Sequence, residues 1–174
     1  LEDALQKRTQ QLAILLHAGE RPNQYLELDD LLDLTANVTL ELLPADLVML
    51  HLLDEDAQVI DSRIIDRTGS VNVQLEPDFI EKSLHLGKSF IWENEQLPLA
   101  NFAAGMTATL QHGVYRMGVL TLLSTSNQYD ENHLRLLTGM SRQASLALRN
   151  AQLYQIQANY AMHLEDMVAE RTKE

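Results

Sequence analysis

The sequence predicts an α+β fold, an antiparallel sheet with helices on one side. Three observations support this prediction. Segments with apolar residues every three or four positions open and close the chain, which is typical of helices. Between them lie short apolar or alternating segments, which favour strands. The order of elements is helix, helix, strands, helix, strands, helix, and such segregation favours α+β architecture.

Two helices are expected at the N-terminal end of the chain. Leucines recur on one face of residues 1–20, and Gly19 with Pro22 predicts the end of that helix. A second amphipathic helix is predicted from Leu28 to Leu43, where Pro44 ends it.

Strands follow the second helix. Asp46–Leu53 is almost continuously apolar, as expected for a strand covered on both faces. The acidic turn at residues 54–57 leads to a partner strand, Gln58–Asp66. A shorter strand is predicted at Val71–Leu75.

The middle of the chain combines one helix, a short strand and a loop. Asp78–Leu86 fits a helix that Gly87 ends. Lys88–Trp92 is expected to be a short strand, and residues 93–104 lack periodicity and predict a loop.

A hairpin and one long helix complete the chain. Gly105–His112 alternates, with Thr107, Thr109 and Gln111 on its polar face, and a turn at Gly113 leads to Tyr115–Ser124. Asp130 is expected to cap a helix that runs to Glu174.

Composition excludes several classes of function. The 174 residues carry a net charge of −12, which disfavours nucleic acid and anionic membrane surfaces as partners. There is no Cys, so disulfides, thiolate metal sites and thioether-linked chromophores are excluded. No apolar segment approaches the roughly 18 residues of a membrane-spanning helix. A cytoplasmic location is expected.

A repeated phrase flanks the predicted domain. Residues 164–172 match residues 1–9 at five positions, with Leu, Glu, Asp, Arg and Thr in common. The chain also starts with Leu and ends in helical register. We therefore expect a segment of a longer polypeptide, with a helical connector reused between modules.

Several phrases resemble the GAF domain, a sensing and dimerisation module of signalling proteins. Residues 50–56 look like its first strand and acidic turn, and residues 110–120 look like its central hairpin. Residues 136–144 and 149–154, the latter with an Asn-Ala-x-Leu-Tyr phrase, look like its exit helix.

The resemblance implies three parts: an N-terminal connector helix over 1–24, a GAF-like domain over 25–155, and a C-terminal coiled-coil connector helix over 156–174. The flanking repeats resemble connectors that join such domains to histidine kinases and diguanylate cyclases. The expected role is a non-catalytic input module of a bacterial-type sensor histidine kinase in a two-component system. The alternative is a ligand-free dimerisation spacer in a diguanylate cyclase or multi-domain kinase.

The long helix favours self-association. From 130 to 174 it would span roughly 68 Å, at about 1.5 Å per residue, which is too long to rest on one domain of this size. A projecting helix is only marginally stable alone, so its apolar side chains predict a parallel homodimer. The alternative is a monomer with a frayed tail. The expected dimer and relay residues are Leu146, Leu153, Ile156, Tyr160, Leu164 and Met167.

Candidate ligand-binding residues come from the loop that covers the pocket in the resembling family and from nearby polar strand faces. Ordinary core packing or exposure to solvent is the alternative for each of them. These candidates are Trp92, Phe102, Thr107, Thr109 and Arg63.

Cofactors and catalysis are not expected. The six His include no pair spaced for a helical metal site, and His51 within an apolar strand predicts a hydrogen-bonded core residue. A covalent bilin is excluded by the lack of Cys, and haem is not expected. No nucleophile, base and orienting group can be assembled from the motifs. The expected partners are a second copy, neighbouring domains of the same polypeptide and a small-molecule ligand.

Overall fold

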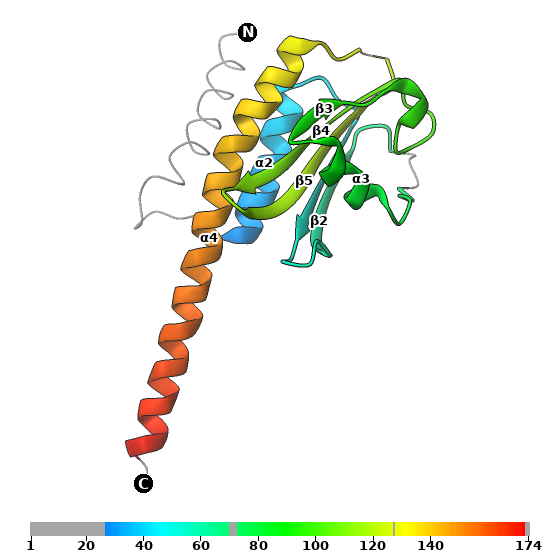
Figure 1. The fold of residues 1–174 in the computed structure, drawn as a ribbon. Helices are drawn as coiled ribbons and strands as arrows, with labels where there is room; N and C mark the ends of the chain where they lie inside the picture. The colour runs from blue at the N-terminus through cyan, green and yellow to red at the C-terminus, as the bar shows by residue number, and fades with distance from the viewer. Residues whose placement is uncertain (1–26, 70–72, 127, 173–174) are drawn as a thin grey trace, which may run out of the picture.

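The computed structural model describes residues 27–69, 73–126 and 128–172 (Figure 1). The connector helix predicted over 1–24 lies outside these residues. The elements are α2 (Leu28–Leu42), β1 (Leu47–Leu53), β2 (Val59–Asp66), α3 (Phe79–Leu86), β3 (Ser89–Ile91), a 3₁₀ turn (Asn94–Gln96), β4 (Ala104–His112), β5 (Tyr115–Ser124) and α4 (Glu131–Thr172).

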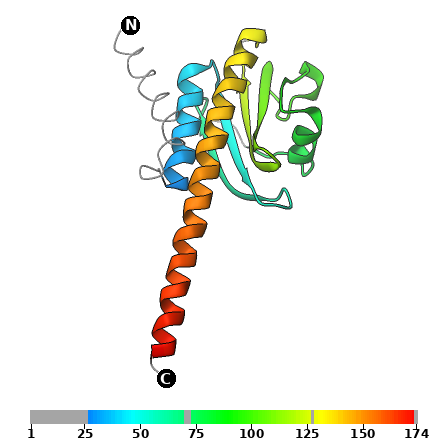
Figure 2. The ribbon, with the colours of Figure 1, turned by 60° about the vertical axis from the view of Figure 1, so that its left-hand side comes forward.

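A single sheet organises the domain. Its five strands run in the order β2-β1-β5-β4-β3, and every neighbouring pair is antiparallel. Figure 2 shows α2 and α4 together on one face of the sheet, with α3 beyond the other face. The prediction of helices on one side therefore holds for the two long helices, while the short α3 covers the opposite face.

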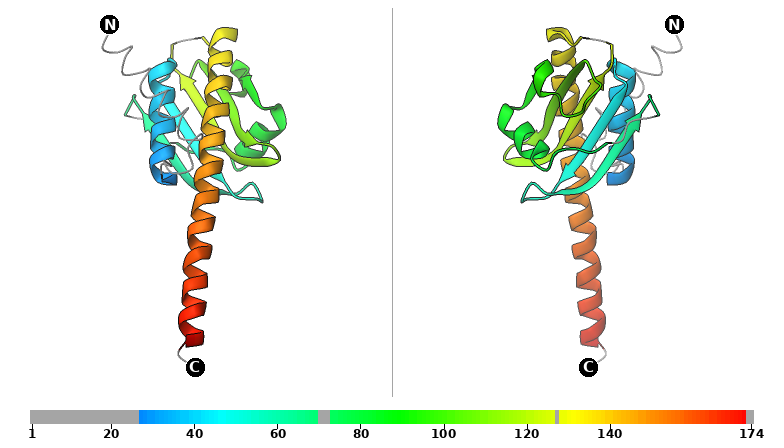
Figure 3. Two further views of the ribbon diagram at one scale, coloured as in Figure 1. Left: turned by 90° about the vertical axis from the view of Figure 1, so that its left-hand side faces the viewer. Right: turned by 90° about the vertical axis from the view of Figure 1, so that its right-hand side faces the viewer.

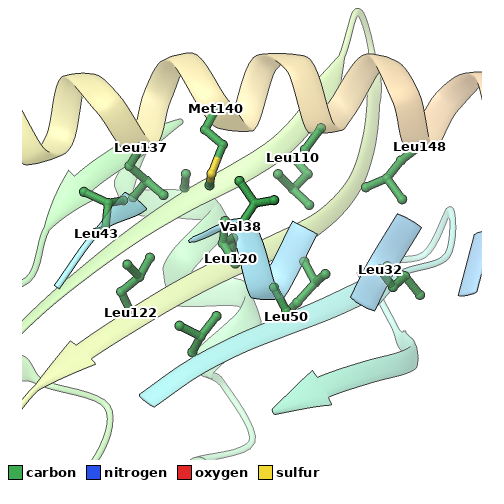
Figure 4. Packing of buried hydrophobic residues seen from close by; sticks show 14 of the residues in the cluster. Leu32, Val38, Leu43, Leu50, Leu110, Leu120, Leu122, Leu137, Met140 and Leu148 are labelled. Carbon is green, nitrogen blue, oxygen red and sulfur yellow. The ribbon is translucent and has the colours of Figure 1, made fainter. Parts of the chain in front are cut away.

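The main core lies between the sheet and the two long helices. Alternate residues of β1, such as Leu50, face α2 and α4, and their neighbours on β5, such as Leu120, do the same. Figure 4 shows Leu137, Met140 and Leu148 of α4 directed toward this layer. All five side chains are almost fully buried, so this face fixes the position of α4 on the sheet.

The strand predicted at Val71–Leu75 is wrong for its described residues, 73–75. Residues 73–75 form no strand. Val73 and Leu75 instead pack, partly buried, against the cluster on the α3 face of the sheet. Their alternating apolar pattern therefore serves packing along a connection, because this segment carries the chain from edge strand β2 to α3.

The last helix begins at the predicted cap and extends well past the domain. Asp130 Oδ1 accepts a hydrogen bond from the backbone N–H of His133 at 3.0 Å. The last buried residue of α4 is Ala151, and residues 153–172 are exposed. Figure 3 shows this half projecting away from the sheet. Within the described ranges, no helix combines the length and apolarity needed to cross a membrane.

Candidate functional site

The α3 face of the sheet carries a second apolar cluster. Leu47 and Met49 of β1 and Leu123 of β5 form its floor, and Phe79 of α3 covers them together with Trp92. All five residues are buried. This face is therefore largely filled by the protein's own side chains.

Gly105 of β4 allows close packing in this cluster. A Cβ atom at this position would lie 2.7 Å from Leu123 Cδ2 and 2.9 Å from Leu97 Cδ2, with Trp92 Cδ1 at 3.2 Å. The absence of a side chain therefore allows Trp92 and Leu97 to lie directly on the sheet.

Trp92 is the centre of the cluster. Only 5% of it is exposed, and its Nε1–H donates a 2.7 Å hydrogen bond to Thr107 Oγ1 on β4. A second hydrogen bond of 3.1 Å joins the hydroxyls of Thr107 and Thr121. The rings of Phe79 and Trp92 stack with centroids 6.0 Å apart. The hydroxyl of Thr107 is thus used to hold Trp92 in place.

Two further predicted site residues lie on the same face. Phe102 packs, partly buried, against the Trp92 cluster. Thr109 lies two positions beyond Thr107, and its backbone N–H donates to the Lys88 carbonyl at 2.7 Å. Its hydroxyl makes a longer 3.4 Å hydrogen bond to the Gly87 carbonyl, at the end of α3. The structure therefore brings Trp92, Phe102, Thr107 and Thr109 to one side of the sheet.

Arg63, the fifth predicted ligand-binding residue, is not brought to this side of the sheet. It pairs with Leu50, so the alternation of β2 directs it to the α2 face. There its guanidinium binds Asp33 at 2.7 Å, Asp29 at 3.2 Å and Asp61 at 2.8 Å. The hydrogen bond to Asp33 is the main cause that raises the pKa of Arg63. Arg63 therefore ties the edge strand β2 to α2.

An open cleft of about 700 Å³ lies beside the Trp92 cluster, between α3 and the segment that begins at Glu95. Phe79 and Trp92 contribute aromatic surface to it, and charged side chains surround them. Its lining residues are Glu76, Asp78, Phe79, Glu81, Lys82, His85, Leu86, Trp92, Glu95, Gln96, Leu97 and Pro98. Trp92 thus lines an open cleft on the α3 face.

His51 departs from the expectation of a hydrogen-bonded core histidine. It lies on β1 beneath α3, only 6% exposed, and its ring meets Phe79 edge-on with centroids 5.9 Å apart. Within the described part of the chain, its Nδ1 has no hydrogen-bond partner. Burial lowers the pKa of His51, because the charged imidazolium is poorly solvated there. The sequence signal was a polar residue inside an apolar strand, but it did not reveal the missing partner.

No metal centre emerges from the residues that the structure describes, since they contain no group of three or more His, Asp or Glu side chains arranged to hold an ion.

The predicted relay residues form one stripe along α4, and where the helix leaves the domain Ile156 of this stripe lines the cleft beside the hairpin of β4 and β5. At about 100° per residue, they fall within an arc of about 80°. The buried residues Ala144 and Leu148 lie on the opposite side of the helix. The predicted set comprises half-buried Leu146 and exposed Leu153, Ile156, Tyr160, Leu164 and Met167.

Comparison with known proteins places the fold. No family model and no curated protein sequence matches the chain. Among solved structures, the GAF domain of an Acinetobacter phosphoenolpyruvate-protein phosphotransferase matches with a TM-score of 0.56 and 19% identity, over 83% of this chain and 95% of that one.

Two other structures show the same likeness. The GAF domain of a Bacillus halodurans two-component sensor histidine kinase has a TM-score of 0.54 and 14% identity, covering 73% of this chain and 97% of that one. Free methionine-R-sulfoxide reductase from Neisseria meningitidis has a TM-score of 0.61 and 14% identity, covering 85% and 93%. The expected architecture is confirmed: the chain has the fold of GAF domains.

Proposed function

We propose that this chain is a regulatory sensor and dimerisation module that passes a signal through α4 to an effector, with a histidine kinase as the effector. Similar structures include GAF domains from a sensor histidine kinase and a phosphotransferase, which supports a regulatory role. The observation that carries the proposal is the exposed apolar stripe on the projecting half of α4.

The stripe favours a second copy as its partner. Ile156 and Tyr160 are exposed to 59% and 62%, although full burial of an exposed Ile side chain gains about 1.5–3 kcal/mol. In proteins most helical stability comes from tertiary packing of an apolar face, and within one copy residues 153–172 are exposed. Association of two α4 helices about a twofold axis buries both stripes at once. A parallel arrangement delivers both C-terminal ends to the same side, where two effector domains could meet.

The mechanism we propose is a shift between two packings of the paired helices. A ligand in the cleft beside Trp92, or a neighbouring domain, would favour one packing through its differential affinity for the two states. A ligand with equal affinity for both would transmit nothing. The module itself performs no chemistry in this proposal. The chain has no Cys, so the proposed mechanism uses neither a thiol nor a bilin attached through one.

The second candidate function is a dimerisation spacer that binds no ligand. The filling of the α3 face favours it: Phe79 and Trp92 occupy that face, and the Thr107 hydroxyl already binds Trp92. The two candidates share the α4 dimer and differ in the use of the cleft.

Light scattering on the intact chain tests the dimer. We expect Tyr160→Glu to shift the mass toward the monomer, because it places a charge in the stripe. Met162→Glu is the matched control, since Met162 is also exposed (64%) but lies on the other side of the helix. Removal of residues 155–174 should weaken association as well. A wild-type chain that stays monomeric at high micromolar concentration would refute the proposal.

Cysteine cross-linking tests the orientation, since the chain has no native Cys to interfere. In a parallel pair, Leu164→Cys lies beside its own copy and forms a disulfide under mild oxidation. In an antiparallel pair centred on Tyr160, position 164 of one copy faces position 156 of the other. Leu164→Cys then does not cross-link with itself, and only a mixture of Leu164→Cys and Ile156→Cys forms the disulfide. That second pattern would exclude the parallel relay.

A thermal-shift screen with cyclic nucleotides and metabolites separates sensor from spacer, because a ligand that binds only the folded state raises the unfolding temperature. A hit that is lost in Glu95→Lys, on the rim of the cleft, supports the sensor. Unchanged unfolding temperatures across the screen favour the spacer. An absorption spectrum of the purified protein checks for haem or bilin.

A further inference from the structure

The hairpin of β4 and β5 contains a bulge close to its tip. Leu110 pairs with Gly118, but the next residue, Gln111, pairs with Arg116. Met117 is therefore an extra residue on β5, opposite a single step of β4. Bulges of this kind bend a strand and redirect the side chains that follow.

The bulge changes which face of the sheet the end of β5 presents. Beyond it, odd-numbered Thr121 and Leu123 point to the α3 face, where they meet Thr107 and the Trp92 cluster. Met117, the extra residue itself, belongs to the core beneath α2 and α4. Tyr115 follows Met117 in pointing to α4. If the strand alternated without a bulge, Tyr115 would share the α3 face with Thr121 and Leu123.

Tyr115 then meets α4 shortly before the helix leaves the domain. The Cζ atom of Arg149 lies 3.7 Å from the centroid of the Tyr115 ring, well inside the range of a cation–π contact. Arg149 comes two residues before Ala151, the last buried residue of α4. The contact therefore sits where the supported half of the helix gives way to the exposed half.

The contact between Tyr115 and Arg149 has an ordered hairpin turn on one side and a cleft on the other. Gln111 Nε2 donates a 2.9 Å hydrogen bond to the Gly113 carbonyl, and Gly113 adopts a φ of 62°, which shapes the tight turn. Past Arg149, a cleft of about 860 Å³ lies between the hairpin and the next turn of α4, where Gln152 and Ile156 line it. The hairpin thus holds the helix at Arg149 and leaves room beside the turn that follows.

We propose that Tyr115 and Arg149 form a latch that sets the direction in which the projecting half of α4 leaves the domain. The latch couples the sheet to the helix, because the hairpin that presents Tyr115 also carries Thr107, whose hydroxyl accepts the hydrogen bond of Trp92. Its signalling role rests on the proposed relay through α4, whereas its structural role stands without a ligand or a dimer.

Distance measurement between two spin labels tests the latch. One label is placed at Asn94→Cys, exposed on the α3 side, and the other at Met162→Cys, on the exposed half of α4 and away from the relay stripe. The absence of native Cys gives specific labelling. Dilution with unlabelled protein removes distances between copies, so the same measurement applies to a monomer or a dimer.

We expect the unmodified pair and Tyr115→Phe to give the same narrow distance distribution, because Phe keeps the aromatic face. Tyr115→Ala and Arg149→Met should each broaden or shift it. The double variant should be no broader than either single variant, because both remove one contact. Unfolding followed by Trp92 fluorescence confirms that each variant is folded.

Three results would overturn the latch: an unchanged distribution in both Tyr115→Ala and Arg149→Met, a Tyr115→Phe variant that behaves like Tyr115→Ala, or additive broadening in the double variant. The proposed relay fails separately, through a monomeric wild-type chain in light scattering. A folded monomer with a Tyr115-dependent distance would keep the latch and reject the dimer.

Discussion

Replacing Thr107 by Val removes one hydroxyl from the centre of the α3 face and changes the shape of the side chain very little. In the wild-type protein, this hydroxyl accepts the indole hydrogen bond of Trp92 at 2.7 Å and contacts the Thr121 hydroxyl at 3.1 Å. Thr107 and Thr121 are fully buried and Trp92 is nearly so, and in Thr107→Val the indole N–H loses this acceptor.

The expected loss follows from that buried donor. A buried polar group left without a partner costs about 1–3 kcal/mol. Thr121→Val is the matched control, because it removes only the hydrogen bond between the two hydroxyls and leaves the indole bound to Thr107. We expect it to cost about 0.5–1.5 kcal/mol. For a chain of this size, about 1 kcal/mol corresponds to about 2–4 °C, so Thr107→Val should lower the unfolding temperature by about 2–12 °C.

Urea and thermal unfolding measure both variants, and Trp92 is a convenient reporter because it is the single Trp in the chain. The emission of folded Thr107→Val should also change, since the environment of the indole N–H differs. If Thr107→Val is no less stable than Thr121→Val, the hydroxyl does not hold Trp92 and the interpretation of this face is wrong.

Three further predictions concern other parts of the domain. Gly118→Ala should destabilise the protein by about 1–3 kcal/mol in urea unfolding, because its Cβ would lie 2.6 Å from the His51 carbonyl oxygen. Gly139→Ala, on an open helix surface, should instead stabilise the protein by up to about 1 kcal/mol. Equal effects of the two substitutions would contradict the close strand contact at Gly118. The pKa of His51 is lowered in the folded state, so the contribution of neutral His51 to stability is complete above the unfolded pKa of about 6.5 and is lost as the pH falls below that value. Between pH 7 and 5, His51→Phe should therefore lose less stability than the wild type. Parallel stability profiles of the two proteins over this pH range would exclude a contribution of His51 to the acid sensitivity. Arg63→Met should lower the free energy of unfolding by about 1 kcal/mol, because it breaks the ion pairs to Asp33 and its neighbours. The difference in stability from the wild type should shrink at 1 M NaCl. A difference that salt does not change would indicate lost packing rather than lost charge.

Local patterns in the sequence determined most of the elements. The apolar segment before the acidic turn became β1, and Asp54 Oδ1 accepts hydrogen bonds from the N–H groups of Asp56 and Gln58, as turn chemistry requires. The cap at Asp130 and the hairpin at Gly113 were likewise predictable. These features depend on residues within a few positions of one another, so the sequence alone carries them.

The face on which a side chain lies depended on the tertiary structure. Arg63 joins the α2 side because β2 pairs with β1 in one register, and a shift of one residue would have reversed it. Tyr115 reaches α4 only because Met117 is an extra residue in the ladder. Among the described residues, Nδ1 of His51 has no hydrogen-bond partner, and the ring is met by Phe79 of α3, which lies far from it in the sequence.

The long helix combines both kinds of information. Its length, its cap and its apolar stripe from Leu146 to Met167 could be predicted, since helical periodicity is local. Only the packed domain separated that stripe from a second one, represented by Leu137 and Leu148, which is buried against the sheet. A sequence pattern shows which residues are apolar, but the partner that covers each face is decided by elements far away in the chain.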